Sequence, residues 1–220
     1  MSGELTENLA DEAQLALAYI GPNLRDALRI FLELDGRLAR IVSATTEPML
    51  GQMRLAWWRD ALGMAVSERP QGDAVLDGIG TYWGGAEASL VALVDGWEHM
   101  LSEPPLDANA ARDFVSGRAE GLSGLAILSG SNALVAEKIR AVGRFWALAD
   151  AASHIAEEAE RQTLLDLAPE LGARVQLSTP FRGVAVLGAL GERSIRAAGA
   201  PLMAGRGAAL VALRAGLLGR

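Results

Sequence analysis

A chain of 220 residues, half of them hydrophobic, can bury a sizeable core as one domain. The chain has no cysteine, which excludes disulfides and thiolate metal sites. The net charge of −7 is unevenly spread, because residues 172–220 contain seven arginines and one acid and carry +6, which leaves −13 on residues 1–171. The basic part either balances the acidic part within one fold or meets anionic lipid, a diphosphate or an acidic partner.

The N-terminus is acidic and polar, unlike a signal peptide, and no apolar run approaches 18 residues. We therefore expect a cytoplasmic protein without a transmembrane segment. Peripheral contact with a membrane surface stays open.

Apolar residues recur along the chain at the three-, four- and seven-residue spacings of amphipathic helices. Alternation of the strand type is nowhere sustained. Glycine and proline punctuate the pattern, which predicts helices over residues 5–20, 24–43, 48–66, 73–83, 86–101, 107–128, 133–167, 181–198 and 205–218. The sequence therefore predicts an all-α bundle of seven to nine helices that forms a single domain over residues 1–220.

The segment 47–62 is the most distinctive part of the chain. It opens with Glu-Pro, a helix-start signal, and then places Trp57 and Trp58 between Arg54 and Arg59. Neighbouring residues of a helix point about 100° apart. We therefore expect one tryptophan in the core and the other at a second contact or a pocket wall.

This run of Glu-Pro followed by Arg-x-x-Trp-Trp-Arg-Asp-Ala-Leu resembles a segment of the squalene/phytoene synthase family. Residues 93–106 and 119–122 are similar to two further segments of that family, and the resemblance covers roughly residues 15–165. It implies an isoprenoid-synthase-type bundle around a central apolar cavity. Active members condense two prenyl diphosphates head to head while Mg²⁺ neutralises the departing diphosphate.

The family's first metal motif, Asp-Asp-x-x-Asp, corresponds here to Ala39, Arg40 and Ser43. All three carboxylates are missing, and Arg40 adds a positive charge where a cation should bind. Asp35 lies one helical turn earlier. It is either an isolated substitute ligand or a solvent-facing carboxylate.

The second motif, Asp-x-x-Glu-Asp, corresponds to residues 154–158, where histidine replaces the first aspartate and glutamate the last. Asp150, His154, Glu157 and Glu158 follow at helical spacings that predict a shared face. This set could hold one divalent cation, for which Mn²⁺, Fe²⁺ or Zn²⁺ suits the ligands better than Mg²⁺. The alternative is an acidic, solvated helix face.

The candidate substrate-binding residues are Arg40, Arg54, Trp57, Trp58 and Arg59. The resemblance implies that an arginine faces the diphosphate end and that a tryptophan lines the prenyl cavity. The alternative is that the tryptophans pack in the core and that each arginine pairs with an acid such as Glu47 or Asp60.

The eroded motifs favour a squalene/phytoene synthase-like protein without prenyl-transfer activity, and its catalytic residues stay unassigned. It would bind an isoprenoid or other lipid, or a protein partner, since relatives with eroded motifs include an assembly factor for respiratory complex I. The alternative is an active prenyl-diphosphate transferase whose divergent metal site relies on Asp35, Asp150, Glu157 and Glu158. We expect no cofactor under the first hypothesis, Mg²⁺ or another divalent cation under the second, and no nucleic-acid partner.

Overall fold

Amphipathic periodicity produces a bundle of helices in the computed structural model, which describes residues 9–45, 47–101 and 104–220. Within these ranges the chain forms ten α-helices and no strand, which confirms the all-α prediction. The isoprenoid-synthase type of bundle stays a prediction. The helices are α1 (Asp11–Tyr19), α2 (Arg25–Ser43), α3 (Pro48–Gly63), α4 (Ala74–Tyr82), α5 (Glu87–Glu98), α6 (Ala108–Leu128), α7 (Ala133–His154), α8 (Glu158–Leu165), α9 (Arg182–Arg196) and α10 (Gly207–Leu218).

Several helices begin where a polar side chain caps free backbone N–H groups. Asp73, Asp107 and Asn132 precede α4, α6 and α7, and each accepts hydrogen bonds from backbone N–H groups two or three residues further on. Pro48 opens α3, where its missing N–H leaves no hydrogen bond unmade. These caps explain why most predicted helix starts agree with the structure.

The predicted single helix over residues 133–167 is wrong, because the chain leaves the helical conformation after His154. Ile155 and Glu157 are extended, with ψ angles of 122° and 121°, and α8 begins at Glu158. Glu158 and Glu160 lie in the first turn of α8, where the positive end of the helix dipole favours acidic residues. The acidic run thus starts a new helix instead of continuing the old one.

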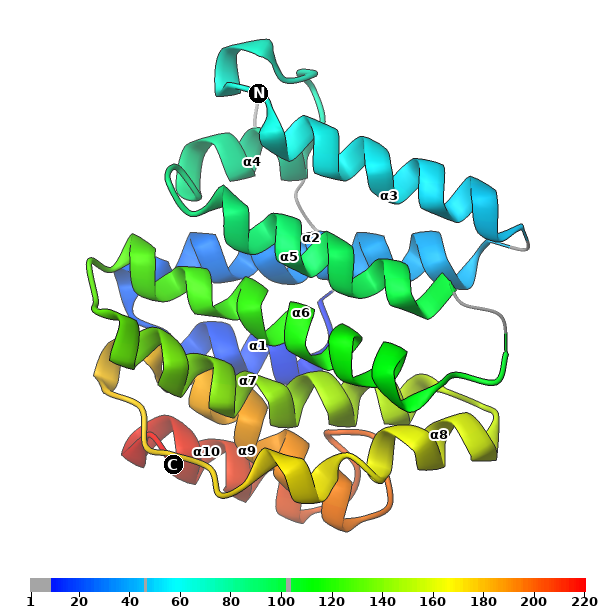
Figure 1. The fold of residues 1–220 in the computed structure, drawn as a ribbon. Helices are drawn as coiled ribbons and strands as arrows, with labels where there is room; N and C mark the ends of the chain where they lie inside the picture. Colours follow the sequence, from blue (N-terminus) through cyan, green and yellow to red (C-terminus); the bar gives the residue numbers. More distant parts are fainter. Residues whose placement is uncertain (1–8, 46, 102–103) are drawn as a thin grey trace.

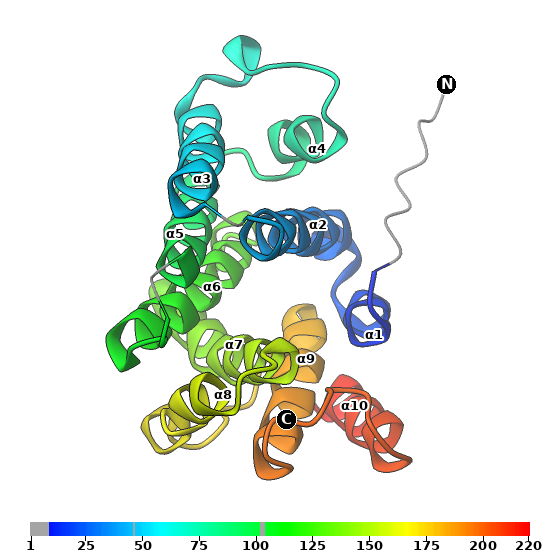
Figure 2. The ribbon, with the colours of Figure 1, turned by 90° about the vertical axis from the view of Figure 1, so that its right-hand side faces the viewer.

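The helices stack in a row in which α3, α5, α6, α7, α9 and α10 follow one another as packed neighbours (Figure 1). The end-on view of Figure 2 shows α2 against the inner side of this row, where it contacts α3, α4, α5 and α6. Because α2 has neighbours on several sides, its residues 27–35 are buried except for Arg29. In the described part of the chain, no helix has both the length and the apolar character that a bilayer span requires.

The position of α9 depends on direct contact between backbones. A Cβ atom at Gly183 would lie 2.3 Å from the carbonyl oxygen of Ala16 in α1. At Gly191 it would lie 2.4 Å from the carbonyl oxygen of Phe145 in α7. Neither site has room for a side chain, so α9 packs closely against both helices.

Candidate functional site

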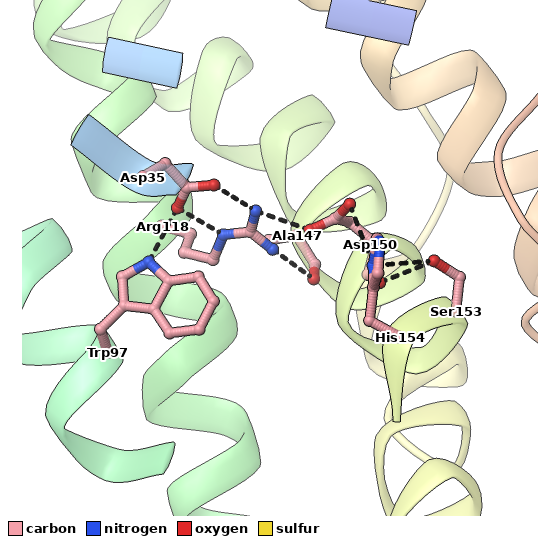
Figure 3. Close-up of polar contacts among 7 residues, drawn as sticks. All are labelled: Asp35, Trp97, Arg118, Ala147, Asp150, Ser153 and His154. Atoms are coloured by element: carbon pink, nitrogen blue, oxygen red, sulfur yellow. Dashed lines mark hydrogen bonds and ion pairs between the residues drawn. The ribbon is translucent and has the colours of Figure 1, made fainter. Parts of the chain in front are cut away.

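A buried ion cluster, formed by Asp35, Arg118 and Asp150, joins three helices at the centre of the bundle (Figure 3). Arg118 of α6 donates from Nε and Nη2 to the two carboxylate oxygens of Asp35 in α2, over 2.9 and 2.6 Å. Its Nη2 also donates to Asp150 of α7 over 2.8 Å, and its Nη1 donates to the carbonyl oxygen of Ala147 over 3.1 Å. One guanidinium therefore holds α2, α6 and α7 together.

Aromatic rings surround this guanidinium. Its central carbon lies 4.0 Å from the ring centroid of Trp146 and 5.3 Å from those of Trp97 and Phe114. These distances allow cation–π attraction, which is strongest where water is excluded. The indole N–H of Trp97 also donates to Asp35 over 2.8 Å, so this carboxylate accepts hydrogen bonds from two residues of other helices, Trp97 of α5 and Arg118 of α6.

Burial and charge act in opposite directions on the cluster. Burial raises the pKa of Asp35 above its usual 3.8, although the charge of Arg118 and the hydrogen bonds from Arg118 and Trp97 oppose the rise. Burial acts to lower the pKa of Arg118, but the charges of Asp35 and Asp150 outweigh it and raise that pKa. Arg118 is therefore a permanent cation, although only 1% of its side chain is exposed.

A cavity of about 440 Å³ lies next to the ion cluster, and residues of α1, α2, α5, α6, α7 and α9 line it. Its size is typical of sites for small organic ligands, which span about 300–1,000 Å³. Much of the wall is apolar, with Leu32, Val42, Met100, Phe114, Ile155 and Leu187. Polar groups enter from Glu12 of α1, from Arg40 and Ser43 of α2 and from His154 of α7. Burial raises the pKa of Glu12 above its usual 4.5, with a smaller contribution from the charge of Asp150.

Comparison with known proteins finds no relative of this chain. No family model, no curated protein and no solved structure matches the chain. The resemblance to squalene/phytoene synthases therefore rests on the residues that carry it.

Positions aligned with both metal motifs border the same space. Ala39, Arg40 and Ser43 of the first motif and His154 of the second line the cavity, as does Asp150 one turn before His154, whereas Glu157 and Glu158 of the second motif do not. The alignment predicts that residues 30–45 and 143–158 lie side by side across a central cleft, and both stretches contribute residues to the lining of this cavity.

The interpretation of Asp35 as a solvent-facing carboxylate is wrong. Its exposed fraction is 6%, and the side chain is bound to Arg118. The residue lies on the same helix as the apolar stripe, but α2 is enclosed on several sides and has no broad solvent face near this position. No local sequence pattern points to this partner, which is 83 residues away.

The expected shared face of Asp150, His154, Glu157 and Glu158 does not form, because α7 ends at His154. Asp150 binds Arg118, His154 has a 75% exposed side chain, and Glu158 pairs with Arg161 at the start of α8. Among the described residues, no group of three or more His, Cys, Asp or Glu side chains is arranged to hold a metal ion.

The candidate substrate residues fall into two places. Arg40 lines the cavity, and it also borders a shallow depression on the outside of α2 and α3 with Arg54 and Trp58. Trp58 is 5% exposed and Trp57 is 44% exposed, which confirms that one tryptophan belongs to the core. The cavity lining includes none of the other four candidates, which are Arg54, Trp57, Trp58 and Arg59.

Arg59 instead joins α3 to α5. Its Nε donates to Asp95 over 2.7 Å, and it also forms an ion pair with Glu98. Hydrogen bonds to Glu98 raise the pKa of Arg59, and Asp95 adds to the effect. The partners differ from the acids named for it, Glu47 and Asp60, and of the two alternatives for Arg59 the ion pairs agree with the structural one.

Proposed function

We propose that this protein is a squalene/phytoene synthase-like protein that binds an isoprenoid or similar lipid chain in its central cavity and has no prenyl-transfer activity. The observation that carries the proposal is the occupation of Asp35 and Asp150 by Arg118. These are the carboxylates that α2 and α7 contribute to the ion cluster beside the cavity.

Head-to-head condensation depends on divalent cations that neutralise a departing diphosphate. A carboxylate can bind such a cation only when its oxygens are available. Asp35 gives both oxygens to Arg118, and Asp150 gives one. The guanidinium of Arg118 therefore occupies the carboxylate oxygens that a metal ion would need. Without the metal ion, the transition state loses its electrostatic stabilisation, and each 1.4 kcal/mol or so of that loss slows the reaction about tenfold. The total loss would slow the reaction by many orders of magnitude.

The rest of the cavity supports the binding of an uncharged chain. Its apolar wall can cover hydrocarbon, and the burial of apolar surface is the main driving force for such ligands. Arg40 and Glu12 place charges of opposite sign in the lining, and Ser43 adds a hydroxyl for a small polar head. The cavity thus provides contacts for an isoprenoid alcohol as well as for a lipid chain with a modest polar end.

Two measurements test this function. Purified protein should release no pyrophosphate from farnesyl or geranylgeranyl diphosphate with Mg²⁺ or Mn²⁺. Farnesol should change the tryptophan fluorescence of the same sample, because Trp97 and Trp146 line the cavity. Metal-dependent release of pyrophosphate would overturn the proposal and favour an active prenyl-diphosphate transferase.

A matched pair of variants locates the binding. Ala39→Phe places a ring in the cavity wall and should abolish the response to farnesol. Ala44→Phe adds the same ring at an exposed position just beyond α2 and should leave the response unchanged. Equal responses from both variants, or none from the wild type, would contradict binding in this cavity.

A further inference from the structure

The C-terminal end of the bundle contains an open pocket of about 660 Å³ between α9 and α10. It shares no lining residue with the central cavity. We call it the arginine pocket, because its charged lining consists of Glu192 and the arginines Arg174, Arg193, Arg196, Arg214 and Arg220. Five guanidinium groups against one carboxylate leave a net side-chain charge of +4.

The internal partners of these arginines are too few to balance them. Glu192 accepts from Arg174 Nε over 2.8 Å and from Arg196 over 2.5 Å. Arg193 donates to the uncharged carbonyl oxygen of Ala204 over 2.7 Å. Within the described part of the chain, Arg214 has no ion-pair or hydrogen-bond partner. The pocket therefore holds positive charge that the protein itself does not neutralise.

Two of the guanidinium groups also keep a buried donor without an acceptor. The Nη1 atoms of Arg174 and Arg193 are buried and make no hydrogen bond. An unmade hydrogen bond of a buried charged donor is costly, and a bound anion would supply the missing acceptor. Phosphate oxygens are the acceptors that arginine forks bind well.

Helix α10 adds an apolar feature beside this charge. Leu210, Leu213 and Leu217 follow at spacings of three and four and are 69%, 45% and 56% exposed. The buried face of the same helix consists of small residues, Ala208, Ala212, Ala215 and Gly216. The largest side chains of α10 thus point away from the core, on a face adjacent to Arg214 of the arginine pocket.

We propose that α10 and the arginine pocket form a docking surface for an anionic phospholipid membrane. The leucines would enter the interface between headgroups and acyl chains, while the arginines bind lipid phosphates beside them. Both features are needed for this choice of ligand, because a soluble phosphate would make no use of exposed leucines. The inference concerns a site separate from the central cavity and does not depend on the proposed function.

The charge distribution sets the direction of approach. Residues 1–171 carry −13 and residues 172–220 carry +6, so an anionic surface repels most of the molecule and attracts its C-terminal part. Figures 1 and 2 show α10 at the edge of the bundle, at the end opposite to α3. This placement leaves α10 accessible to a flat surface without steric obstruction by α3.

Sedimentation with vesicles tests the proposal. The wild type should bind vesicles of phosphatidylcholine and phosphatidylglycerol in equal parts, should not bind phosphatidylcholine alone, and should lose binding as salt is raised. The double variant Arg214→Gln, Arg220→Gln should bind at least about tenfold more weakly, because each arginine near an anionic surface contributes to affinity. The double variant Leu213→Ser, Leu217→Ser should also bind more weakly, through the loss of apolar contact.

The control variant makes the same change of charge elsewhere. Arg112→Gln combined with Arg161→Gln removes two arginines of α6 and α8 and should leave vesicle binding unchanged. Circular dichroism confirms that each variant is folded. The proposal is overturned if the folded wild type does not bind anionic vesicles. It is also overturned if the control variant loses as much binding as the Arg214→Gln, Arg220→Gln variant, or if the Leu213→Ser, Leu217→Ser variant binds as tightly as the wild type. Stabilisation by inorganic phosphate without vesicle binding would also overturn it, in favour of a soluble phosphate ligand.

Discussion

Arginine has opposite roles in the central ion cluster and in the arginine pocket. In the central ion cluster one arginine serves two aspartates, whereas in the arginine pocket five arginines share one glutamate. Arg118 is enclosed by aromatic rings and carboxylates, and Arg196 has a 75% exposed side chain. The first arrangement satisfies its charges internally and stabilises the fold, while the second leaves charge available for a ligand.

The strongest way to break this comparison is to make the same substitution in both places. Arg118→Met should lower the free energy of unfolding by about 3–5 kcal/mol, because it leaves two carboxylates buried without their cation. Arg214→Met should leave the free energy of unfolding unchanged within error, since this side chain is exposed and has no internal partner in the described chain. Urea denaturation of both variants measures the difference. Equal losses would show that the two arginines do not differ in role.

The two aspartates of the cluster sharpen the comparison further. Asp35→Asn should lower the free energy of unfolding by about 1–3 kcal/mol, and Asp150→Asn by less. Asp35 receives two hydrogen bonds from Arg118 and one from Trp97, and its side chain is 8% exposed. Asp150 receives one from Arg118 and is 19% exposed. The reverse order in thermal and urea denaturation would contradict this account of the cluster.

The smallest expected effect concerns Glu12, a third acid near the cluster. Burial raises its pKa above 4.5, so the folded protein holds this proton more tightly than the unfolded chain does. Its contribution to stability is complete below the unfolded pKa and is lost as the pH rises through the folded pKa. Glu12→Gln should therefore gain stability relative to the wild type as the pH is raised from about 4 to 7, by less than about 1 kcal/mol. Urea denaturation at both pH values measures the difference in the free energy of unfolding between the variant and the wild type. A difference that does not change with pH would contradict the raised pKa of Glu12.

Local pattern was sufficient to predict the all-α class and the position of most helices, but not how the helices pack. Helices α2, α4, α6 and α10 begin and end within two residues of their predicted limits, because caps and glycine–proline signals act over a few residues. The break after His154 was missed because apolar periodicity continues across it. Its local signal was the run of acids from Glu157 to Glu160, which is typical of a first helical turn.

The candidate site was predictable only in part, because its decisive contacts join residues far apart in sequence. The alignment located Ala39, Arg40, Ser43 and His154, which line the cavity, but also Glu157 and Glu158, which do not. It did not locate Arg118, since no pattern around position 118 indicates that this residue binds Asp35. Arg118 stands between polar and small residues of α6, so its burial became apparent only from the packing of the helices.

The backbone contacts of α9 have a consequence for how this chain can change over generations. Alanine is one nucleotide substitution away from every glycine codon, yet at Gly183 and Gly191 its methyl group would overlap a carbonyl oxygen of the neighbouring helix. A crowded side chain elsewhere in the core can be relieved by a second mutation to a smaller residue, but a carbonyl oxygen has no smaller replacement. A substitution at either glycine therefore requires a shift of backbone, in α9 or in the helix beside it, which a change of one neighbouring side chain does not supply.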